Sequence, residues 1–185
     1  MNDLSAIFTK SNIRILRELS KNEGLYIREI AERTSLSPAK VHQAIKLFKE
    51  FGIVLEREAK NKKVISLARE SVLLKRISSL LNIFEISRLK EFRELLDYGK
   101  VGVYGSFANG EDLPESDIDM WIYSEKKLNL AELKGITRGI EKYFGKEVKL
   151  LILSKNKICN LREKDPEFYF RIRLTSVAFN GEIFD

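Results

Sequence analysis

The sequence predicts an α+β fold made of two domains that are joined by a helical segment. Residues 1–70 hold three helical patterns followed by two strand-like runs, whereas strand and helix patterns alternate after residue 98. Between them, one amphipathic pattern continues without a Pro- or Gly-rich linker. We therefore expect a first domain over 1–70, a linking helical segment over 71–98 and a second domain over 99–185.

Most of the net positive charge belongs to the first domain. The chain has 33 Lys and Arg against 27 Asp and Glu, a formal net charge of +6. Residues 1–70 carry 14 basic and 9 acidic residues, a net +5, whereas 71–185 carry 19 and 18. A basic domain indicates a polyanionic partner. The charged fraction of 32%, with Gln43 as the only glutamine, is also typical of a thermophilic source.

Two simple features restrict the class of protein. A single cysteine, Cys159, excludes an internal disulfide and a thiolate-cluster metal site. The start, MNDLSAIFTK, has no basic leader, and no apolar run approaches the roughly 20 residues that span a bilayer. We therefore expect a cytoplasmic protein without a membrane segment.

Three helices and a hairpin are expected in the first domain. The segments SNIRILRELSKN and YIREIAERT place apolar residues at helical spacing, with Ser11 as the expected N-cap of the first. A third helix begins after Ser37, has Pro38 at its first position and ends at Gly52. Two strand-like runs, in VLEREAKNKKVISLA, then surround a polar tip at 60–63.

This order of elements resembles the winged helix-turn-helix family. In that family the third helix enters the major groove of double-stranded DNA and the wing touches the flanking backbone. The lysines would contact phosphates, and His42 and Gln43 are the better candidates for reading base edges. The alternative is a module for dimerisation or protein docking. The expected DNA-binding residues are Ser37, Lys40, His42, Gln43, Lys46 and Lys49 on the helix, and Lys60, Lys62 and Lys63 on the wing.

The linking segment, residues 71–98, is expected to form one long amphipathic helix or two. Its apolar residues recur at helical spacing, which favours packing against a core. The same surplus of apolar residues also suits a homodimer interface, and a dimer would match a two-fold operator.

Strands and helices alternate in the second domain, which predicts a mixed sheet. VGVYG, DIDMWIYS and EVKLLILS are the expected strands. A short turn or helix follows the first strand, and NLAELKGITRGIEKYFG and DPEFYFRIRLT are the expected helices. The final stretch, VAFNGEIFD, is expected to be a hairpin with an Asn-Gly turn.

Two aspartates on the second strand are candidate metal ligands. Side chains alternate between the faces of a strand, so Asp117, Asp119 and Trp121 share one face. Carboxylates about 7 Å apart repel each other unless a cation lies between them. Mg²⁺ takes oxygen ligands and keeps waters or phosphates as further ligands. The alternative is a pair of aspartates on a solvated face.

The residues Gly105 and Ser106 follow the first strand and open a turn. Backbone N–H groups and a hydroxyl at such a turn can hold a phosphate, and glycine permits its close approach. A phosphate site beside a dicarboxylate metal site is what nucleotidyl transfer requires.

The stretch GSFANGEDLPESDIDMWI resembles the signature of the DNA polymerase β-like nucleotidyltransferase superfamily, in particular its minimal members. The resemblance covers about residues 98–154 and implies an NTP as substrate or ligand, with Mg²⁺ or Mn²⁺. The roles it implies are triphosphate binding by Gly105 and Ser106, shaping of the loop by Gly110, support of the strand start by Ser116, and metal binding and catalysis by Asp117 and Asp119.

Two positions depart from the family pattern. Asn109 stands where the family commonly has an arginine, which weakens the expected phosphate contact. Active members also carry a third carboxylate on a following strand, and Lys149 occupies that position here. A lysine would place a cation beside the two aspartates. Glu147 lies on the same strand face but one two-residue step away, about 6–7 Å.

Two functions follow from these patterns. One is a DNA-binding protein whose nucleotidyltransferase domain transfers a nucleoside monophosphate from an NTP to an unidentified hydroxyl. The other is a transcriptional regulator with a degenerate domain that senses nucleotide or contacts a protein partner, as an antitoxin does. Near the end of the chain, the run from Phe168 to Phe170 with Arg171 and Arg173 fits either base stacking or core packing.

Overall fold

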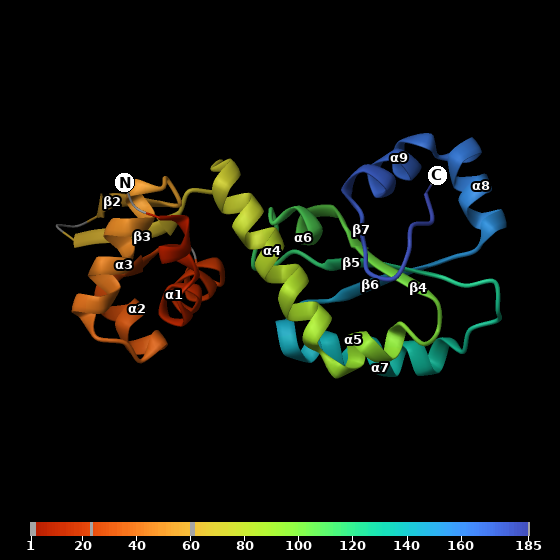
Figure 1. The fold of residues 1–185 in the computed structure, drawn as a ribbon, viewed down its shortest axis with the longest axis horizontal. Coiled ribbons are helices and arrows are strands. Elements are labelled where there is room, and N and C mark those ends of the chain that lie inside the picture. The colour runs from red at the N-terminus through yellow and green to blue at the C-terminus, as the bar shows by residue number, and fades with distance from the viewer. Residues whose placement is uncertain (1–2, 23, 60–61, 185) are drawn as a thin grey trace. The chain divides into compact units, whose positions relative to one another are not determined.

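The computed structural model describes residues 3–22, 24–59 and 62–184. The chain forms two compact units, Met1–Lys75 and Arg76–Asp185 (Figure 1). The described residues contain no helix with the length and apolar character that a membrane span requires.

The first unit contains three α-helices and a small sheet among its described residues. Thr9, and not the expected Ser11, caps the first helix, because the Thr9 hydroxyl accepts a hydrogen bond from the backbone N–H of Asn12 at 3.2 Å. Its elements are a short 3-10 helix η1 (Leu4–Phe8), α1 (Lys10–Ser20), β1 (Leu25–Tyr26), α2 (Ile27–Thr34), α3 (Pro38–Glu50), β2 (Val54–Ala59) and β3 (Lys62–Leu67).

Helix α3 follows the sequence prediction closely. The hydroxyl of Ser37 accepts a hydrogen bond from the backbone N–H of Lys40 at 3.3 Å, and Pro38 is the first helical residue. Gly52, with φ of 63°, follows the helix. The apolar face of α3 is buried as predicted: Val41, Ala44, Ile45 and Phe48.

The sheet of the first unit has the order β1-β3-β2, with antiparallel pairing throughout. The hairpin of β2 and β3 was predicted, whereas the two-residue β1 was not. Leu25 pairs with Ile65, and both side chains are buried. A strand this short has no periodicity of its own, so only its partner reveals it.

The second unit contains a mixed four-stranded sheet, as predicted, in the order β6-β5-β4-β7. Strands β5 and β6 are parallel, and the other neighbours are antiparallel. Helix α8 was not anticipated. The elements are α4 (Val72–Arg88), which begins in the first unit, α5 (Lys90–Leu95), β4 (Lys100–Tyr104), α6 (Gly105–Asn109), β5 (Ile118–Tyr123), α7 (Leu130–Phe144), β6 (Val148–Leu153), α8 (Lys155–Lys164), α9 (Pro166–Thr175) and β7 (Val177–Ala178).

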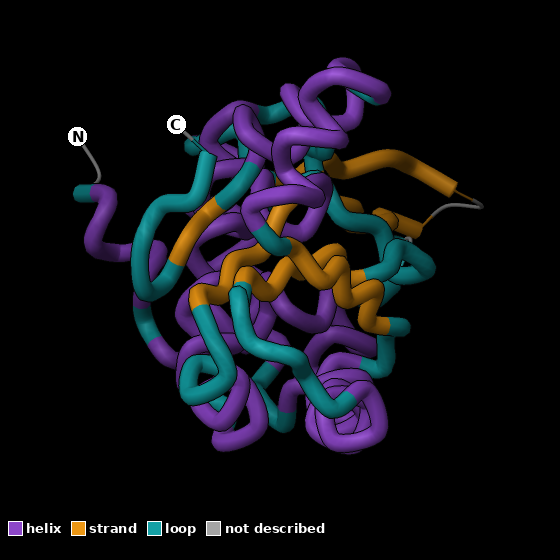
Figure 2. The backbone as a smooth tube through the Cα atoms, turned by 90° about the vertical axis from the view of Figure 1, so that its right-hand side faces the viewer, coloured by secondary structure: helices purple, strands orange, loops and turns teal. Residues whose placement is uncertain are grey.

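Helices lie on both sides of this sheet (Figures 1 and 2). One face packs with α5 and α7 through a core that includes Phe92, Met120 and Ile140. On the other face, Trp121 packs with Tyr169 and other apolar residues. The face that carries the aspartates is therefore covered along part of its length.

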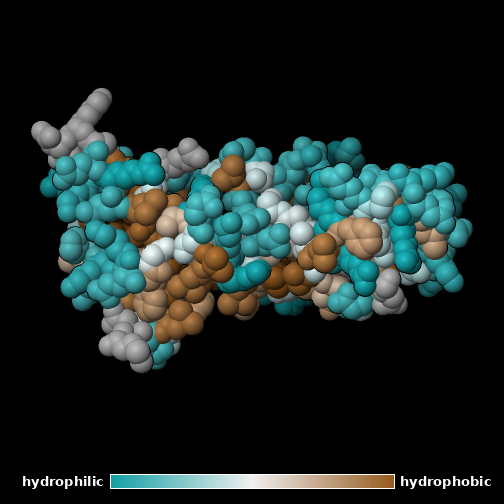
Figure 3. All heavy atoms as spheres, turned by 90° about the horizontal axis from the view of Figure 1, so that it is seen from above, coloured by the Kyte–Doolittle hydropathy of each residue, from teal (hydrophilic) through white to brown (hydrophobic). Residues whose placement is uncertain are grey.

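The segment 71–98 forms two helices, α4 and α5, with Leu89 at the N-cap of α5. Its residues from Arg76 onward belong to the second unit. Phe92 and Leu95 are buried in the core beneath the sheet. Exposed apolar side chains nevertheless remain on the molecular surface, where brown groups lie among teal ones (Figure 3).

The hairpin expected in VAFNGEIFD is not formed by the described residues. Instead, β7 pairs with β4, and Gly102 lies opposite Ala178. The side chain of Asn180 accepts a hydrogen bond from the Val101 N–H at 2.7 Å and donates one to the Gly99 carbonyl at 2.8 Å. The open edge of β4 supplies these backbone partners, so the chain pairs with it and not with itself.

Candidate nucleotide site and DNA-binding surface

The turn between β4 and α6 lies directly against Asp119. Gly105 has φ of 69°, a conformation that glycine adopts readily and other residues resist. A Cβ at this position would lie 3.0 Å from the Oδ2 atom of Asp119. The backbone N–H of Gly105 donates a hydrogen bond at 3.0 Å to the hydroxyl of Thr175 in α9. The glycine turn and the acidic strand, which the family resemblance joins in one site, therefore lie side by side.

Strand β6 contributes Lys149 to the same place. In the parallel pairing of β5 with β6, Lys149 is the register partner of Asp119. Its ammonium forms an ion pair with Oδ2 of Asp117, which immediately precedes β5. The described residues include no group of three His, Cys, Asp or Glu side chains able to hold a metal ion. Lys149 therefore lies beside both aspartates, at the position where the family resemblance implies a third carboxylate.

The loop between α6 and β5 is held by two of the predicted residues. Gly110, with φ of 72°, ends α6. The hydroxyl of Ser116 accepts a hydrogen bond from the N–H of Leu113 at 2.9 Å, while its own N–H donates to the Leu113 carbonyl at 3.0 Å. Ser116 therefore closes a tight turn that leads into Asp117. Ser106 is half-buried at the start of α6, and its carbonyl accepts a hydrogen bond from Glu111 N–H at 2.9 Å.

The side chains expected on the DNA-facing side of α3 are all exposed. The Ser37 hydroxyl also serves as the helix cap. Lys60 lies outside the described residues, and Lys62 is in β3. The exposed set on and before α3 is Ser37, Lys40, His42, Gln43, Lys46 and Lys49.

Comparison with family models assigns both units. Residues 86–173 match the nucleotidyltransferase domain, and residues 8–54 match the winged helix-turn-helix DNA-binding domain. The chain contains both domains. No curated protein gave a significant match. The fusion predicted from the sequence is thus confirmed, and the nucleotidyltransferase match already begins within α4.

The carboxylates of the nucleotidyltransferase domain lie in a mixed electrostatic environment. Burial raises the pKa of Asp119; the positive charges of Lys149 and Arg171 oppose this effect, and the charge of Asp117 adds to it. The hydrogen bond and charge of Asp117 raise the pKa of Lys149, so this ammonium remains protonated at neutral pH. Burial, together with the charge of Asp119, raises the pKa of Tyr104 to about 12. Neither Lys149 nor Tyr104 can therefore serve as a proton acceptor at neutral pH.

The donor set suits a divalent ion only in part. Two carboxylates are typical of Mg²⁺ sites, in which phosphates and waters supply the other ligands. One of the four carboxylate oxygens, Oδ2 of Asp117, already contacts the Lys149 ammonium. A divalent ion held by Asp117 and Asp119 must therefore compete with this cation.

A buried polar cluster beneath the loop was missed by the sequence analysis. Lys146 and Asp112 form an ion pair at 3.0 Å, with side chains only 12% and 15% exposed. The amide of Asn82 in α4 donates hydrogen bonds to Asp112 at 2.8 Å and to the Phe107 carbonyl at 3.0 Å. The Lys146 ammonium also donates to the carbonyls of Leu113 and Ser116. In the sequence, these residues resemble any surface lysine, aspartate or asparagine.

Helix α9 also contributes to the site, and the sequence analysis did not single out its residue Thr175. The hydroxyl of Thr175 donates to the Arg171 carbonyl at 2.7 Å while it accepts from the Gly105 turn. The Arg171 guanidinium lies over the ring of Phe168, 4.9 Å from its centroid. Tyr169 is buried in the core, so core packing accounts for this member of the aromatic run.

In the winged helix domain, Glu56 neutralises two of the lysines expected to contact DNA. Its carboxylate pairs with Lys49 at 3.2 Å and with Lys63 at 2.8 Å. Hydrogen bonds from Lys63 and then Lys49 lower the pKa of Glu56, so the carboxylate is ionised at neutral pH. The net positive charge that these two lysines present to a phosphate backbone is therefore smaller than their number suggests.

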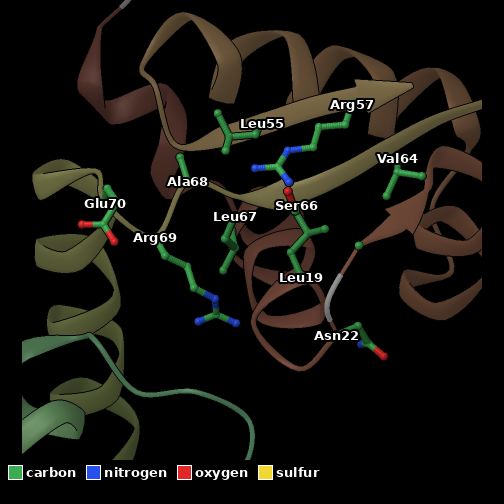
Figure 4. A pocket seen from close by; sticks show the side chains of 11 residues that line it. Leu19, Asn22, Leu55, Arg57, Val64, Ser66, Leu67, Ala68, Arg69 and Glu70 are labelled. Carbon is green, nitrogen blue, oxygen red and sulfur yellow. The ribbon is translucent and has the colours of Figure 1, made fainter. Parts of the chain in front are cut away.

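The winged helix domain also contains an open cavity of about 570 Å³ (Figure 4). Its walls include the apolar Leu19, Leu55 and Val64 together with the guanidinium groups of Arg57 and Arg69. All residues that line it precede α4. It is therefore separate from the predicted nucleotide site.

Proposed function

We propose that this protein is a DNA-binding regulator whose nucleotidyltransferase domain binds a nucleoside triphosphate but does not efficiently transfer a nucleoside monophosphate from it. The observation that supports this function is the Lys149–Asp117 ion pair. It stands where active members of the family, by resemblance, carry a carboxylate that activates the attacking hydroxyl.

The residues of this site are suited to binding a nucleotide, but they lack a group that would activate the attacking hydroxyl. Gly105, without a Cβ, lets the phosphates approach the backbone beside Asp119. A divalent ion held by Asp117 and Asp119 would supply neutralisation of the triphosphate and its alignment for displacement. Lys149 is protonated and has no lone pair with which to accept a proton from an incoming hydroxyl. We therefore expect binding to persist while turnover is lost.

A labelled nucleotide tests this function directly. Wild-type protein, with ATP and either Mg²⁺ or Mn²⁺, should transfer no more label to protein, nucleic acid or small hydroxyl acceptors than Asp117→Ala does. The Lys149→Asp variant should gain transfer, because it restores an acidic group beside Asp119. Transfer by the wild type at a rate that Lys149→Asp does not exceed would contradict the proposal.

A second candidate function is Mg²⁺-dependent transfer of a nucleoside monophosphate to a hydroxyl acceptor. The close packing of Gly105 against the half-buried Asp119 favours it, because the glycine and the acid to which the family resemblance assigns nucleotide binding and catalysis lie side by side. In this case label transfer by wild-type protein should be abolished by Asp117→Ala or by Asp119→Ala.

The regulatory half of the proposal rests on the basic, exposed face of α3. Binding to the protein's own promoter should weaken steeply with salt, since each phosphate contact releases counterions. A fluorescence anisotropy titration at several ionic strengths measures this slope. Failure to retain duplex DNA at low salt would exclude the regulatory half.

Leu80 and Phe84 of α4 are exposed, which supports a proposed homodimer or protein partner; light scattering reports the oligomeric state.

A further inference from the structure

Family resemblance assigns no function to the Lys149 side chain of the candidate site. It is 58% exposed, yet its ammonium contacts Asp117. The strand pairing places its backbone directly beside Asp119. It therefore lies among the groups that would surround a nucleotide's phosphates, and its flexible stem leaves the ammonium free to reorient.

The charges of this site differ from those of a three-carboxylate site. Three carboxylates carry a charge of about −3 and cannot hold a polyphosphate unless metal ions neutralise both. Here Asp117 and Asp119 are accompanied by Lys149 and by Arg171, whose positive charge acts on Asp119. The formal charges of these four side chains sum to about zero at neutral pH.

We propose that the Lys149 ammonium takes the place of a divalent cation, so that the nucleotidyltransferase domain binds a nucleoside triphosphate without metal. This inference rests on the proposed nucleotide binding, but the Lys149 ammonium, and not a divalent ion on Asp117 and Asp119, then neutralises the triphosphate. An ammonium is a well-established point-charge ligand for phosphate. Lys149 would release Asp117 and contact a phosphate oxygen instead, so its ammonium would exchange one anionic partner for another.

Isothermal titration calorimetry of the full chain tests the proposal, with ATP and inorganic tripolyphosphate as probes, each in excess EDTA and in MgCl₂. The variant Lys149→Met removes the charge, and Lys149→Arg keeps it. Lys134→Met is the matched control, because Lys134 is an exposed lysine on α7 of the same domain. Circular dichroism and thermal unfolding verify that each variant is folded.

We expect the wild-type Kd for ATP to change by less than about threefold between EDTA and MgCl₂. In EDTA, Lys149→Met should weaken binding at least about tenfold, while Lys149→Arg and Lys134→Met resemble the wild type. Wild-type binding that needs MgCl₂, or Lys149→Met binding in EDTA as tightly as the wild type, would overturn this inference and leave the proposed nucleotide binding intact. Absence of binding to either probe under both conditions would remove the proposed function itself.

Discussion

The substitution Gly105→Ala tests whether the turn and the acidic strand form one site. Gly105 has φ of 69°, and an added Cβ would lie 3.0 Å from Oδ2 of Asp119. The alanine therefore introduces a left-handed conformation and a close contact with the carboxylate. The first effect concerns the backbone alone, and the second concerns the candidate site.

The two effects can be separated in magnitude. A non-glycine residue in the left-handed region is less stable by about 1–2 kcal/mol. Crowding a packed position adds about 1–2 kcal/mol, because Asp119 or the turn must move by a few tenths of an ångström. Gly145→Ala has the first effect without the second, because Gly145 has φ of 67° and an added Cβ there meets nothing within 4 Å.

Differential scanning calorimetry of both variants measures the difference. At about 4 °C per kcal/mol, Gly105→Ala should lower the Tm by about 4–8 °C more than Gly145→Ala does. The added methyl group should also block the approach of a phosphate to the backbone of the turn and weaken ATP binding by about tenfold or more, whereas Gly145→Ala should bind as the wild type does. Equal losses of stability in the two variants, with unchanged ATP binding in Gly105→Ala, would refute the reasoning.

Three further predictions concern the other charged groups. Lys146→Met should lower the free energy of unfolding by about 2–3 kcal/mol in urea denaturation, because it leaves the mostly buried Asp112 carboxylate without its cation. Asp119→Asn should raise the thermal stability at neutral pH. Burial raises the pKa of Asp119 above 3.8, so ionisation disfavours the folded state, and the gain should vanish below that pH. Glu56→Gln should tighten DNA binding and steepen its salt dependence in anisotropy titrations, because it frees Lys49 and Lys63 to contact phosphates.

The local elements were largely predictable from the sequence because short-range patterns determine them. Ser37, Pro38 and the apolar face of α3 act within a few residues of one another, so the sequence suffices to define that helix. The strand that ends just before Gly105 and the strand that carries Asp119 likewise follow from their runs of apolar residues. Family resemblance, rather than periodicity, joined these two segments into one expected site.

Errors arose where a residue's partner is distant in the chain. The final segment contains an Asn-Gly pair that locally favours a hairpin, but Val177 and Ala178 pair instead with the open edge of β4. Trp121 shares a strand face with Asp119, yet it is fully buried, since α9 and the C-terminal segment cover that part of the sheet. Neither outcome can be read from the neighbours of these residues in the sequence.

The sequence by itself determined the two domains, the order of most elements and the identities of the acids, the glycine turn and the unusual lysine. Only the tertiary structure decided which acid the lysine contacts. Lys149 lies beside Asp119 in the strand register but forms its ion pair with Asp117. Backbone pairing sets the positions of the strands, whereas the flexible side chain of a lysine can pair with any of several nearby carboxylates. That choice depends on three-dimensional distances and leaves no pattern in the order of residues.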